Sequence, residues 1–220
     1  MTPMRRKVKL SGKARLFVVS APSGCGKGTI LGEVFKDRDA YFSVSCTTRS
    51  PRTGETDGVN YHFISDEKFE EMIKNDEFLE YAGFVGNYYG TPAGPVKENL
   101  EKGRDVVLEI ETQGAFQIKK KIPDAVLLFI LPPSVAELKR RLNKRGTETP
   151  EVIEKRVARA KGEIEKSYQY DYVIMNDGLE DAVRDFLTVM DCAKNNGNGG
   201  ECFRADNEET KKMIEEVLEL

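Results

Sequence analysis

The sequence lacks the features that identify several common classes of protein. It contains one histidine, His62, and four cysteines without any Cys-x-x-Cys spacing. A single histidine disfavours a Ser-His or Cys-His hydrolase, and the cysteine spacing disfavours a structural zinc site. The cysteines do not form the framework of a disulfide-stabilised secreted protein, which indicates a reducing compartment.

Neither a long apolar run nor an excess of one charge is present. No apolar stretch approaches the roughly 20 residues of a membrane-spanning helix. The 34 Lys and Arg residues face 37 Asp and Glu residues, for a formal net charge of −3, whereas dedicated nucleic-acid-binding proteins are usually basic overall. We therefore expect a cytoplasmic protein with no nucleic-acid or membrane partner. The basic segment 1–15 lacks the apolar core of a secretory signal, and it is either a solvated leader or an organelle-targeting remnant.

The pattern of apolar residues predicts an α/β fold. A chain of 220 residues can bury a full core as one α/β domain with small insertions. Nearly continuous apolar runs are typical of parallel strands that are covered on both faces. Strands are predicted at 16–19, 41–45, 105–111, 125–131 and 170–176. Helical periodicity between them predicts a helix from Ile30 and helices over 114–121 and 179–190. Two further helices are predicted from their start signals. One begins at Ser134, which forms a capping box with Glu137, and the other has Thr149 as N-cap followed by Pro150.

Two segments differ in character from these βα units. Residues 47–95 are rich in aromatic residues, glycine and turn signals, which predicts an insertion with short antiparallel strands. At its start, Cys46–Glu55 is expected to be a loop, and further along Ser65 is expected to cap a helix. Residues 192–220 form a Gly/Asn-rich linker and a terminal helix, with Asp206 and Glu209 as caps. Its apolar residues dock either on the core or on a second chain. These residues are Met213, Ile214, Val217 and Leu218.

One stretch has the character of a phosphate-binding loop. The apolar run 16–19 leads into Ser20-Ala21-Pro22-Ser23-Gly24-Cys25-Gly26-Lys27-Gly28-Thr29, after which the pattern becomes helical. Glycines let successive backbone N–H groups point at a phosphate, and the helix N-terminus adds partial positive charge. The stretch departs from the usual motif because Ala21 replaces its first glycine and Gly28 follows the lysine. The alternative is an ordinary glycine-rich strand-to-helix turn.

Charged side chains at three other places are candidates for ligand binding. Arg49 and Arg52 lie in a hydroxyl-rich loop and could clamp an oxyanion, or form a solvated basic turn. Glu109 and Glu111 follow a buried strand, and open α/β sheets bind ligands at that end. Further arginines cluster in the helical region 140–159, where a salt-bridged solvated face is the alternative.

Taken together, these segments resemble guanylate kinases. The resemblance is carried by Ser23–Thr29, Thr48–Glu55, Phe78–Tyr81, Gly86–Pro92, Glu109–Ala115, Arg145–Glu148 and Tyr170–Asp177. It extends from about Leu16 to Met190 in the expected order, and several segments are specific to this family among P-loop proteins. The segments before and after lie outside it.

The resemblance implies a fold and a reaction. The fold is a P-loop three-layer α/β fold with a central parallel sheet, a mixed antiparallel GMP-binding insertion and a helical lid. The reaction is ATP-dependent phosphorylation of GMP to GDP with Mg²⁺, a step in purine nucleotide metabolism. The expected domains are a core (14–46, 96–139 and 168–191), a GMP-binding insertion (47–95), a lid (140–167) and the tail (192–220).

The resemblance also assigns site residues. Catalytic roles fall to Lys27, Arg49, Arg145 and Arg156. ATP-binding residues are Ser23, Gly24, Cys25, Gly26, Lys27, Gly28, Thr29 and Asn176. GMP-binding residues are Ser45, Arg49, Arg52, Tyr61, Glu80, Tyr89, Thr91 and Glu111. Thr29 is a weak Mg²⁺ ligand, because the ion binds mostly to phosphates and water. The family usually has Asp where Glu111 stands.

The sequence leaves two other functions open. A non-catalytic interaction module could keep the fold and lose ATP binding, but it would not need Gly24, Gly26 and Lys27. A kinase for another nucleoside monophosphate is disfavoured by Ser45 and Glu80. A hydroxyl can donate to guanine O6 and a carboxylate can accept from N1–H and N2–H₂, and adenine lacks both donors.

Overall fold

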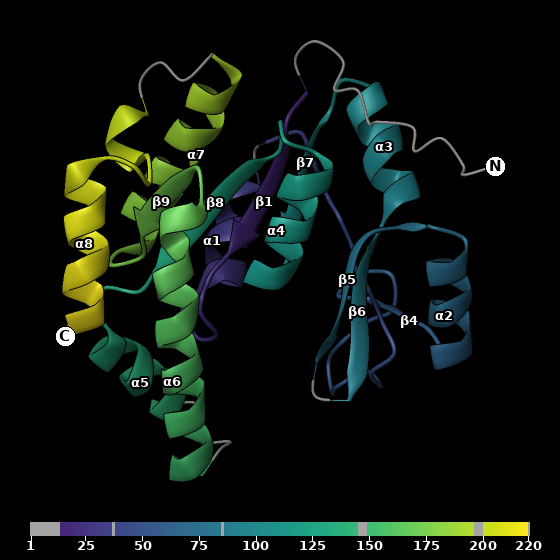
Figure 1. The fold of residues 1–220 in the computed structure, drawn as a ribbon, viewed down its shortest axis with the longest axis horizontal. Helices are drawn as coiled ribbons and strands as arrows, with labels where there is room; N and C mark the ends of the chain where they lie inside the picture. Colours follow the sequence, from purple (N-terminus) through teal and green to yellow (C-terminus); the bar gives the residue numbers. More distant parts are fainter. Residues whose placement is uncertain (1–13, 37, 85, 145–148, 196–199, 220) are drawn as a thin grey trace. The chain divides into compact units, whose positions relative to one another are not determined.

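The computed structural model describes residues 14–36, 38–84, 86–144, 149–195 and 200–219 (Figure 1). The chain divides into two compact units. The first comprises Met1–Phe17 and Ala40–Ala125, and the second comprises Val18–Asp39 and Val126–Leu220. The expected N-terminal leader falls almost wholly outside the described residues. No helix in the described ranges is long and apolar enough to cross a membrane.

The predicted parallel sheet is confirmed. Its strands follow the order β2-β7-β1-β8-β9, and the division between the units falls within β1. Strand β7 pairs in parallel with β2, and β8 pairs in parallel with β9. The four apolar residues of β1 and the terminal Ser20 are all buried, as expected for a strand that is covered on both faces. The strands are β1 (Leu16–Ser20), β2 (Ala40–Phe42), β7 (Asp105–Glu109), β8 (Val126–Leu131) and β9 (Tyr172–Met175).

The first unit also contains a second, mixed sheet in the order β4-β3-β6-β5. The predicted antiparallel pairing is confirmed between β5 (Phe78–Phe84) and β6 (Asn87–Pro92). The expectation that Cys46 lies in a loop is wrong. Cys46–Thr47 is a short strand, β3, because it bonds to both β6 and β4 (His62–Phe63).

Three helices belong to the first unit. They are α2 (Asp66–Lys74), α3 (Ala93–Glu101) and α4 (Thr112–Lys121). The Ser65 hydroxyl caps α2 as predicted and accepts a hydrogen bond from the Lys68 amide at 3.2 Å. Helix α2 contributes Phe69 and Met72 to a small core with Cys46 and Phe78.

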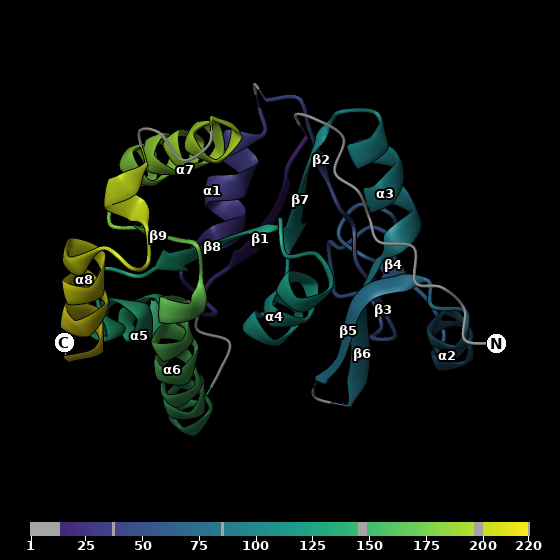
Figure 2. The ribbon, with the colours of Figure 1, turned by 45° about the horizontal axis from the view of Figure 1, so that its top comes forward.

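The second unit carries most of the helices, and α7 packs against α1 (Figure 2). The predicted caps of two of them are confirmed. The Glu137 amide donates to the Ser134 hydroxyl at 3.0 Å, and Thr149 precedes Pro150 at the start of α6. The helical segments are α1 (Lys27–Val34), α5 (Val135–Lys144), α6 (Pro150–Glu165), η1 (Lys166–Gln169), α7 (Leu179–Lys194), η2 (Glu201–Phe203) and α8 (Glu208–Glu219).

Four predicted helix boundaries are wrong. Helix α1 begins at Lys27 instead of Ile30, because Gly26 is its N-cap. Helix α4 begins at Thr112 instead of Gly114, because the extended backbone of Glu111 already serves as its N-cap. Helix α7 continues past Met190 to Lys194, because two further buried residues extend its apolar face. Helix α8 is capped by Asn207 and not by Asp206 or Glu209; the Asn207 side-chain oxygen accepts from the amides of Glu209 (2.8 Å) and Thr210 (3.4 Å).

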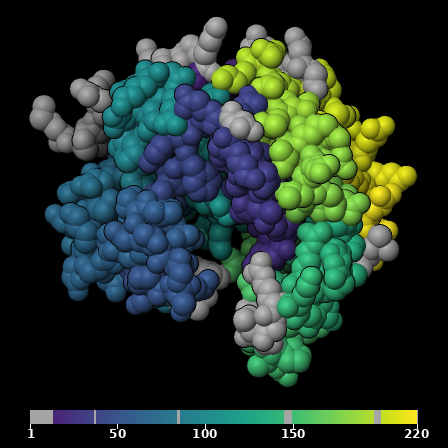
Figure 3. All heavy atoms as spheres, turned by 180° about the vertical axis from the view of Figure 1, so that it is seen from behind, coloured from purple at the N-terminus to yellow at the C-terminus, as the bar shows by residue number. Residues whose placement is uncertain are grey.

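The C-terminal segment docks on the second unit, which is one of the two alternatives that the sequence leaves open. Residue Arg204 forms an antiparallel bridge with Tyr172 of β9, and the Ala205 amide donates to the Asp171 carbonyl at 3.2 Å. Helix α8 packs against α5 and α6, and its Ile214 and Val217 are 0% and 1% exposed. From behind, the yellow C-terminal residues adjoin the yellow-green residues of α7 (Figure 3).

Candidate functional site

The glycine-rich loop of the second unit joins β1, which ends at Ser20, to α1, which begins at Lys27. Gly26 is the N-cap of α1, and its φ of 91° lies in the left-handed region. A Cβ atom on Gly26 would lie 2.7 Å from Nδ2 of Asn176. Both the backbone angle and this close approach therefore require glycine.

The loop is held from behind through the carbonyl of Cys25. Nδ2 of Asn176 donates to this carbonyl at 2.6 Å, and Nη1 of Arg141 donates to it at 3.3 Å. Arg141 also donates to the Asn176 carbonyl at 3.4 Å. The Cys25 thiol is fully buried beside the Ile130 carbonyl, and burial raises its pKa to about 12. It stays protonated at neutral pH, so it acts as a packing group and is no nucleophile.

The arginines of α5 and α6 fall into two groups. Arg156 donates to the Ser23 hydroxyl in the loop at 2.5 Å, and Arg141 reaches the loop carbonyl. Arg140 and Arg159 instead form surface ion pairs, with Glu137 at 2.6 Å and Glu163 at 2.9 Å. Hydrogen bonds from Arg140 and Arg141 lower the pKa of Glu137 to about 2. Only part of the arginine cluster is thus a salt-bridged solvated face. Arg145 lies outside the described residues.

The remaining loop residues occupy the first turn of α1. Gly28 and Thr29 are exposed, and Lys27 is half-buried. The Thr29 amide donates to the Gly26 carbonyl at 3.0 Å, which closes the turn. The first N–H groups of a helix have no acceptor within the helix, so this end is electrostatically suited to an anion.

In the first unit, Arg49 lies in a group of aromatic and acidic side chains. Its guanidinium donates to both carboxylate oxygens of Glu55, each at 2.9 Å. The guanidinium carbon lies 5.5 Å from the ring centroid of Tyr61, and the rings of Tyr61 and Tyr89 are 5.9 Å apart, edge to face. Arg52 has an exposed side chain, and its amide donates to Glu55 at 2.7 Å. Glu55 therefore organises both predicted phosphate-binding arginines.

A second polar group in this unit centres on Glu80. Its side chain is only 5% exposed, and the hydroxyl of the fully buried Thr91 donates to Oε1 at 2.6 Å. Burial raises the pKa of Glu80, and the Thr91 hydrogen bonds partly oppose this. Glu111 is exposed at the N-cap of α4, and its charge also raises the pKa of Glu80. Ser45 is half-buried and directly precedes β3; its carbonyl accepts from the His62 amide at 2.9 Å.

The structure thus groups Arg49 with Tyr61 and Tyr89, and Glu80 with Thr91. Sequence reasoning missed two residues that order these groups, Glu55 and Arg141. Glu55 could have been found as the one acidic residue in a loop with two arginines. Arg141 could not, because its loop contacts depend on residues 116 and 35 positions away along the chain.

The parallel sheet and the glycine-rich strand-to-helix turn define an α/β protein of the P-loop class. Comparison with known proteins identifies the family within this class. The family model for guanylate kinase matches residues 13–193. A guanylate kinase of Thermus thermophilus is 51% identical over 178 residues, which are 81% of each chain. One from Clostridioides difficile is 54% identical over 184 residues, covering 83% of this chain and 90% of the relative.

A solved structure agrees with the sequence relatives. The crystal structure of guanylate kinase from Anaplasma phagocytophilum superimposes with a TM-score of 0.70 at 32% identity, covering 84% of this chain and 89% of that one. The chain belongs to the guanylate kinase family. The segment after residue 193, with η2 and α8, lies beyond the match to the family model.

Proposed function

We propose that this protein transfers the γ-phosphoryl group of ATP to GMP, giving ADP and GDP. Membership of the guanylate kinase family supports the reaction. The observation that carries it for this chain is the ordered loop 23–29, whose left-handed Gly26 starts α1. A non-catalytic module would not need this loop. The expected division into core, GMP-binding insertion (47–95) and lid (140–167) belongs to the same proposal.

The loop residues would bind the phosphates of ATP, which is used as its magnesium complex. Lys27 would reach the β- and γ-phosphates. Across the described residues, no group of three His, Cys, Asp or Glu side chains could hold a metal ion. This fits a magnesium ion held mostly by phosphates and water, with the exposed Thr29 hydroxyl as one protein ligand. The ion would neutralise phosphate charge. Asn176 would lie near the adenine, and its hydrogen bond to the Cys25 carbonyl would hold the loop in place.

The first unit would bind GMP through two different kinds of contact. Arg49, Arg52, Tyr61 and Tyr89 would hold the phosphate, because guanidinium groups and phenol hydroxyls donate to phosphate oxygens. Glu80 would accept from N1–H and N2–H₂ of guanine, Ser45 would donate to O6, and Thr91 and Glu111 would line the base. A buried carboxylate without a matching donor is costly, so this part of the site would reject adenine.

Phosphoryl transfer needs little covalent chemistry from the protein. A phosphate oxygen of GMP bonds to the γ-phosphorus as the bond to the β–γ bridging oxygen breaks, and ADP leaves with that oxygen. Positive side chains stabilise the charge that spreads over the transferred group. Lys27, Arg145 and Arg156 are the proposed sources of this charge, and a lid that carries the arginines would also exclude water from ATP.

An assay of ADP release with GMP, AMP, CMP or UMP as acceptor tests the proposal. We expect turnover with GMP, and turnover with AMP lower by a factor that can reach about 10⁴–10⁵. Equal turnover of AMP and GMP would contradict the guanine contacts. A folded protein that binds GMP and turns over none of the four nucleotides would favour the interaction module.

A further inference from the structure

We propose that one face of α4, formed by Gly114, Gln117 and Lys121, holds the Glu80 carboxylate in the position from which it reads the base. These are positioning residues, since they act through Glu80. The inference rests on the proposed function, in which Glu80 is the guanine reader. Three separate features of the first unit support it.

The first feature is a bulge in β5 next to Glu80. Phe78 lies opposite Pro92 and Glu80 lies opposite Thr91, so Leu79 is an extra residue in the pairing with β6. Side chains of a regular strand alternate between its two faces. Here Phe78, Leu79 and Glu80 are all buried, at 4%, 5% and 5% exposure. The bulge thus turns Glu80 to the buried side beside Thr91, as bulges near functional sites often do.

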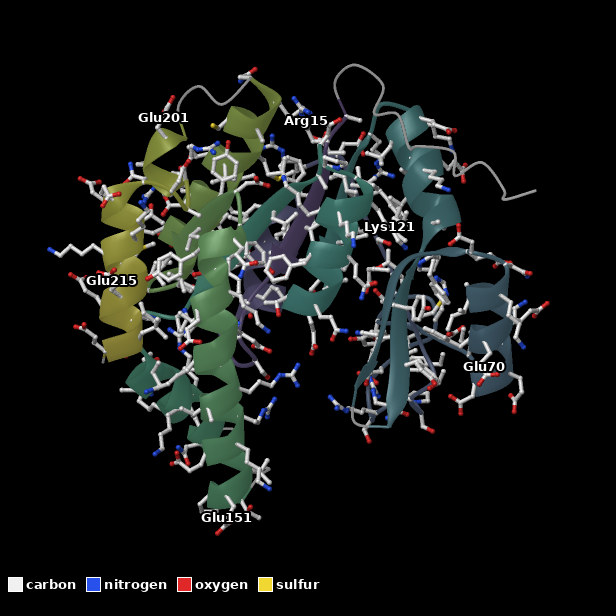
Figure 4. The ribbon with its side chains drawn as sticks, in the orientation of Figure 1. Arg15, Glu70, Lys121, Glu151, Glu201 and Glu215 are labelled. Atoms are coloured by element: carbon white, nitrogen blue, oxygen red, sulfur yellow. The ribbon has the colours of Figure 1, made fainter. Side chains whose placement is uncertain are left out.

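The second feature is a pair of hydrogen bonds from α4 to the backbone of β5. Nε2 of Gln117 donates to the Tyr81 carbonyl at 3.1 Å, and Nζ of Lys121 donates to the Leu79 carbonyl at 2.5 Å. Lys121 extends from the end of α4 on the side of β5 (Figure 4). Strand β5 is the last strand of its sheet, so one edge of its backbone has no strand partner among the described residues. The two anchored carbonyls belong to the residues on either side of Glu80.

The third feature is the space left by Gly114. It lies one turn before Gln117 on the same side of α4, as residues three apart do. A Cβ atom on Gly114 would lie 2.6 Å from Oε2 of Glu80 and 3.0 Å from its Cδ. Glycine within a helix is otherwise unfavourable relative to alanine. The missing side chain therefore creates the room that the Glu80 carboxylate occupies.

These contacts set the size of the expected effect. Alanine at position 114 would displace Oε2 by several tenths of an ångström, because Cβ atoms essentially never lie within 3.0 Å of another heavy atom and Oε2 is at the flexible end of its side chain. Loss of a hydrogen bond to a charged group lowers affinity by about 10–100-fold. We expect Gly114→Ala to weaken GMP binding by about this factor, because guanine would no longer meet the displaced carboxylate in good geometry. IMP lacks the 2-amino group that Glu80 would contact, so its binding should weaken less.

Calorimetric titration of GMP, IMP and ATP into the full-length protein tests the inference. Gly114→Ala should raise the Kd for GMP, narrow the preference for GMP over IMP, and leave the Kd for ATP within about twofold of wild type. The matched control is Gly94→Ala in α3, where a Cβ atom would meet nothing within 4 Å. If Gly114→Ala does not fold, the variants Gln117→Ala and Lys121→Met test the inference instead. Each removes one anchor and should weaken GMP binding about 2–10-fold, whereas the exposed Lys120→Met should not.

The role of Glu80 itself separates this inference from the proposed function. If Glu80→Gln leaves GMP binding unchanged, the assignment of Glu80 in the proposed function is wrong, and the inference falls with it. If Glu80→Gln weakens GMP binding but the α4 variants match their controls, only the inference is overturned. It is also overturned if the effect of Gly114→Ala on GMP binding persists in a Glu80→Ala background, where the displaced carboxylate is absent.

Discussion

Replacing Ile214 in α8 tests whether the C-terminal helix is an integral part of the second unit. Its side chain is 0% exposed against α5 and α6, so Ile214→Ala leaves a cavity in a packed contact. Such substitutions cost about 2–5 kcal/mol. Alanine is the better helix former, but that gain is at most about 0.7 kcal/mol, so the loss of packing dominates. For a chain of this size each kcal/mol lowers Tm by about 2–4 °C, so a decrease of about 4–20 °C is expected.

Differential scanning calorimetry of the full-length protein measures this change. Glu215→Ala is the matched control, since Glu215 is the next residue and is exposed on α8 (Figure 4). It should leave Tm within about 1 °C, because surface substitutions usually have small effects. The affinity for GMP should stay unchanged in both variants. A Tm for Ile214→Ala equal to that of the control would show that α8 does not contribute to the stability of the second unit.

Three further predictions concern the proposed chemistry. Lys27→Ala should abolish turnover and preserve GMP binding as measured by calorimetry. A kcat close to that of wild type would contradict the assignment of Lys27 to the ATP site. Arg145→Ala should lower kcat and kcat/KM together by about 10³-fold, and Arg145→Lys should restore little, because an ammonium lacks the planar fork; steady-state kinetics in which either variant keeps wild-type kcat would contradict this. Burial raises the pKa of Glu80, and guanine needs the ionised carboxylate, so KM for GMP should rise as the pH falls, starting above the ordinary carboxyl pKa of 4.5. The Glu80→Gln variant is the control, because the GMP phosphate titrates in the same way with this variant and with wild type. Identical pH profiles of KM for the two proteins would refute the assignment of Glu80 as the guanine reader.

Features that depend on neighbouring residues in the chain were predictable. The buried strands β1, β7, β8 and β9 follow from unbroken apolar runs, which few other structures accommodate. The caps Ser65, Ser134 and Thr149 follow from the chemistry of a single turn. The glycine-rich loop was also predictable from the sequence, because its strand, turn and helix follow one another within 20 residues.

Features that depend on distant residues were not predictable. The bulge at Leu79 is defined by its pairing with β6, and nothing in the local sequence marks it. The Cys46–Thr47 strand exists because two partners from elsewhere in the chain bond to it. The prediction that this helix ends at Met190 is wrong because it ignored the buried Cys192 and Ala193, whose burial depends on tertiary packing.

The bridge between Arg204 and Tyr172 has a consequence for association between molecules. Strand β9 is the last strand of the parallel sheet, and an uncovered last strand can pair with the same strand of another molecule. The segment around Arg204 occupies part of that edge, with a backbone bond from Ala205 to Asp171 and the Arg204 guanidinium 5.8 Å from the Tyr172 ring. The region beyond the family match thus shields the sheet from edge-to-edge aggregation.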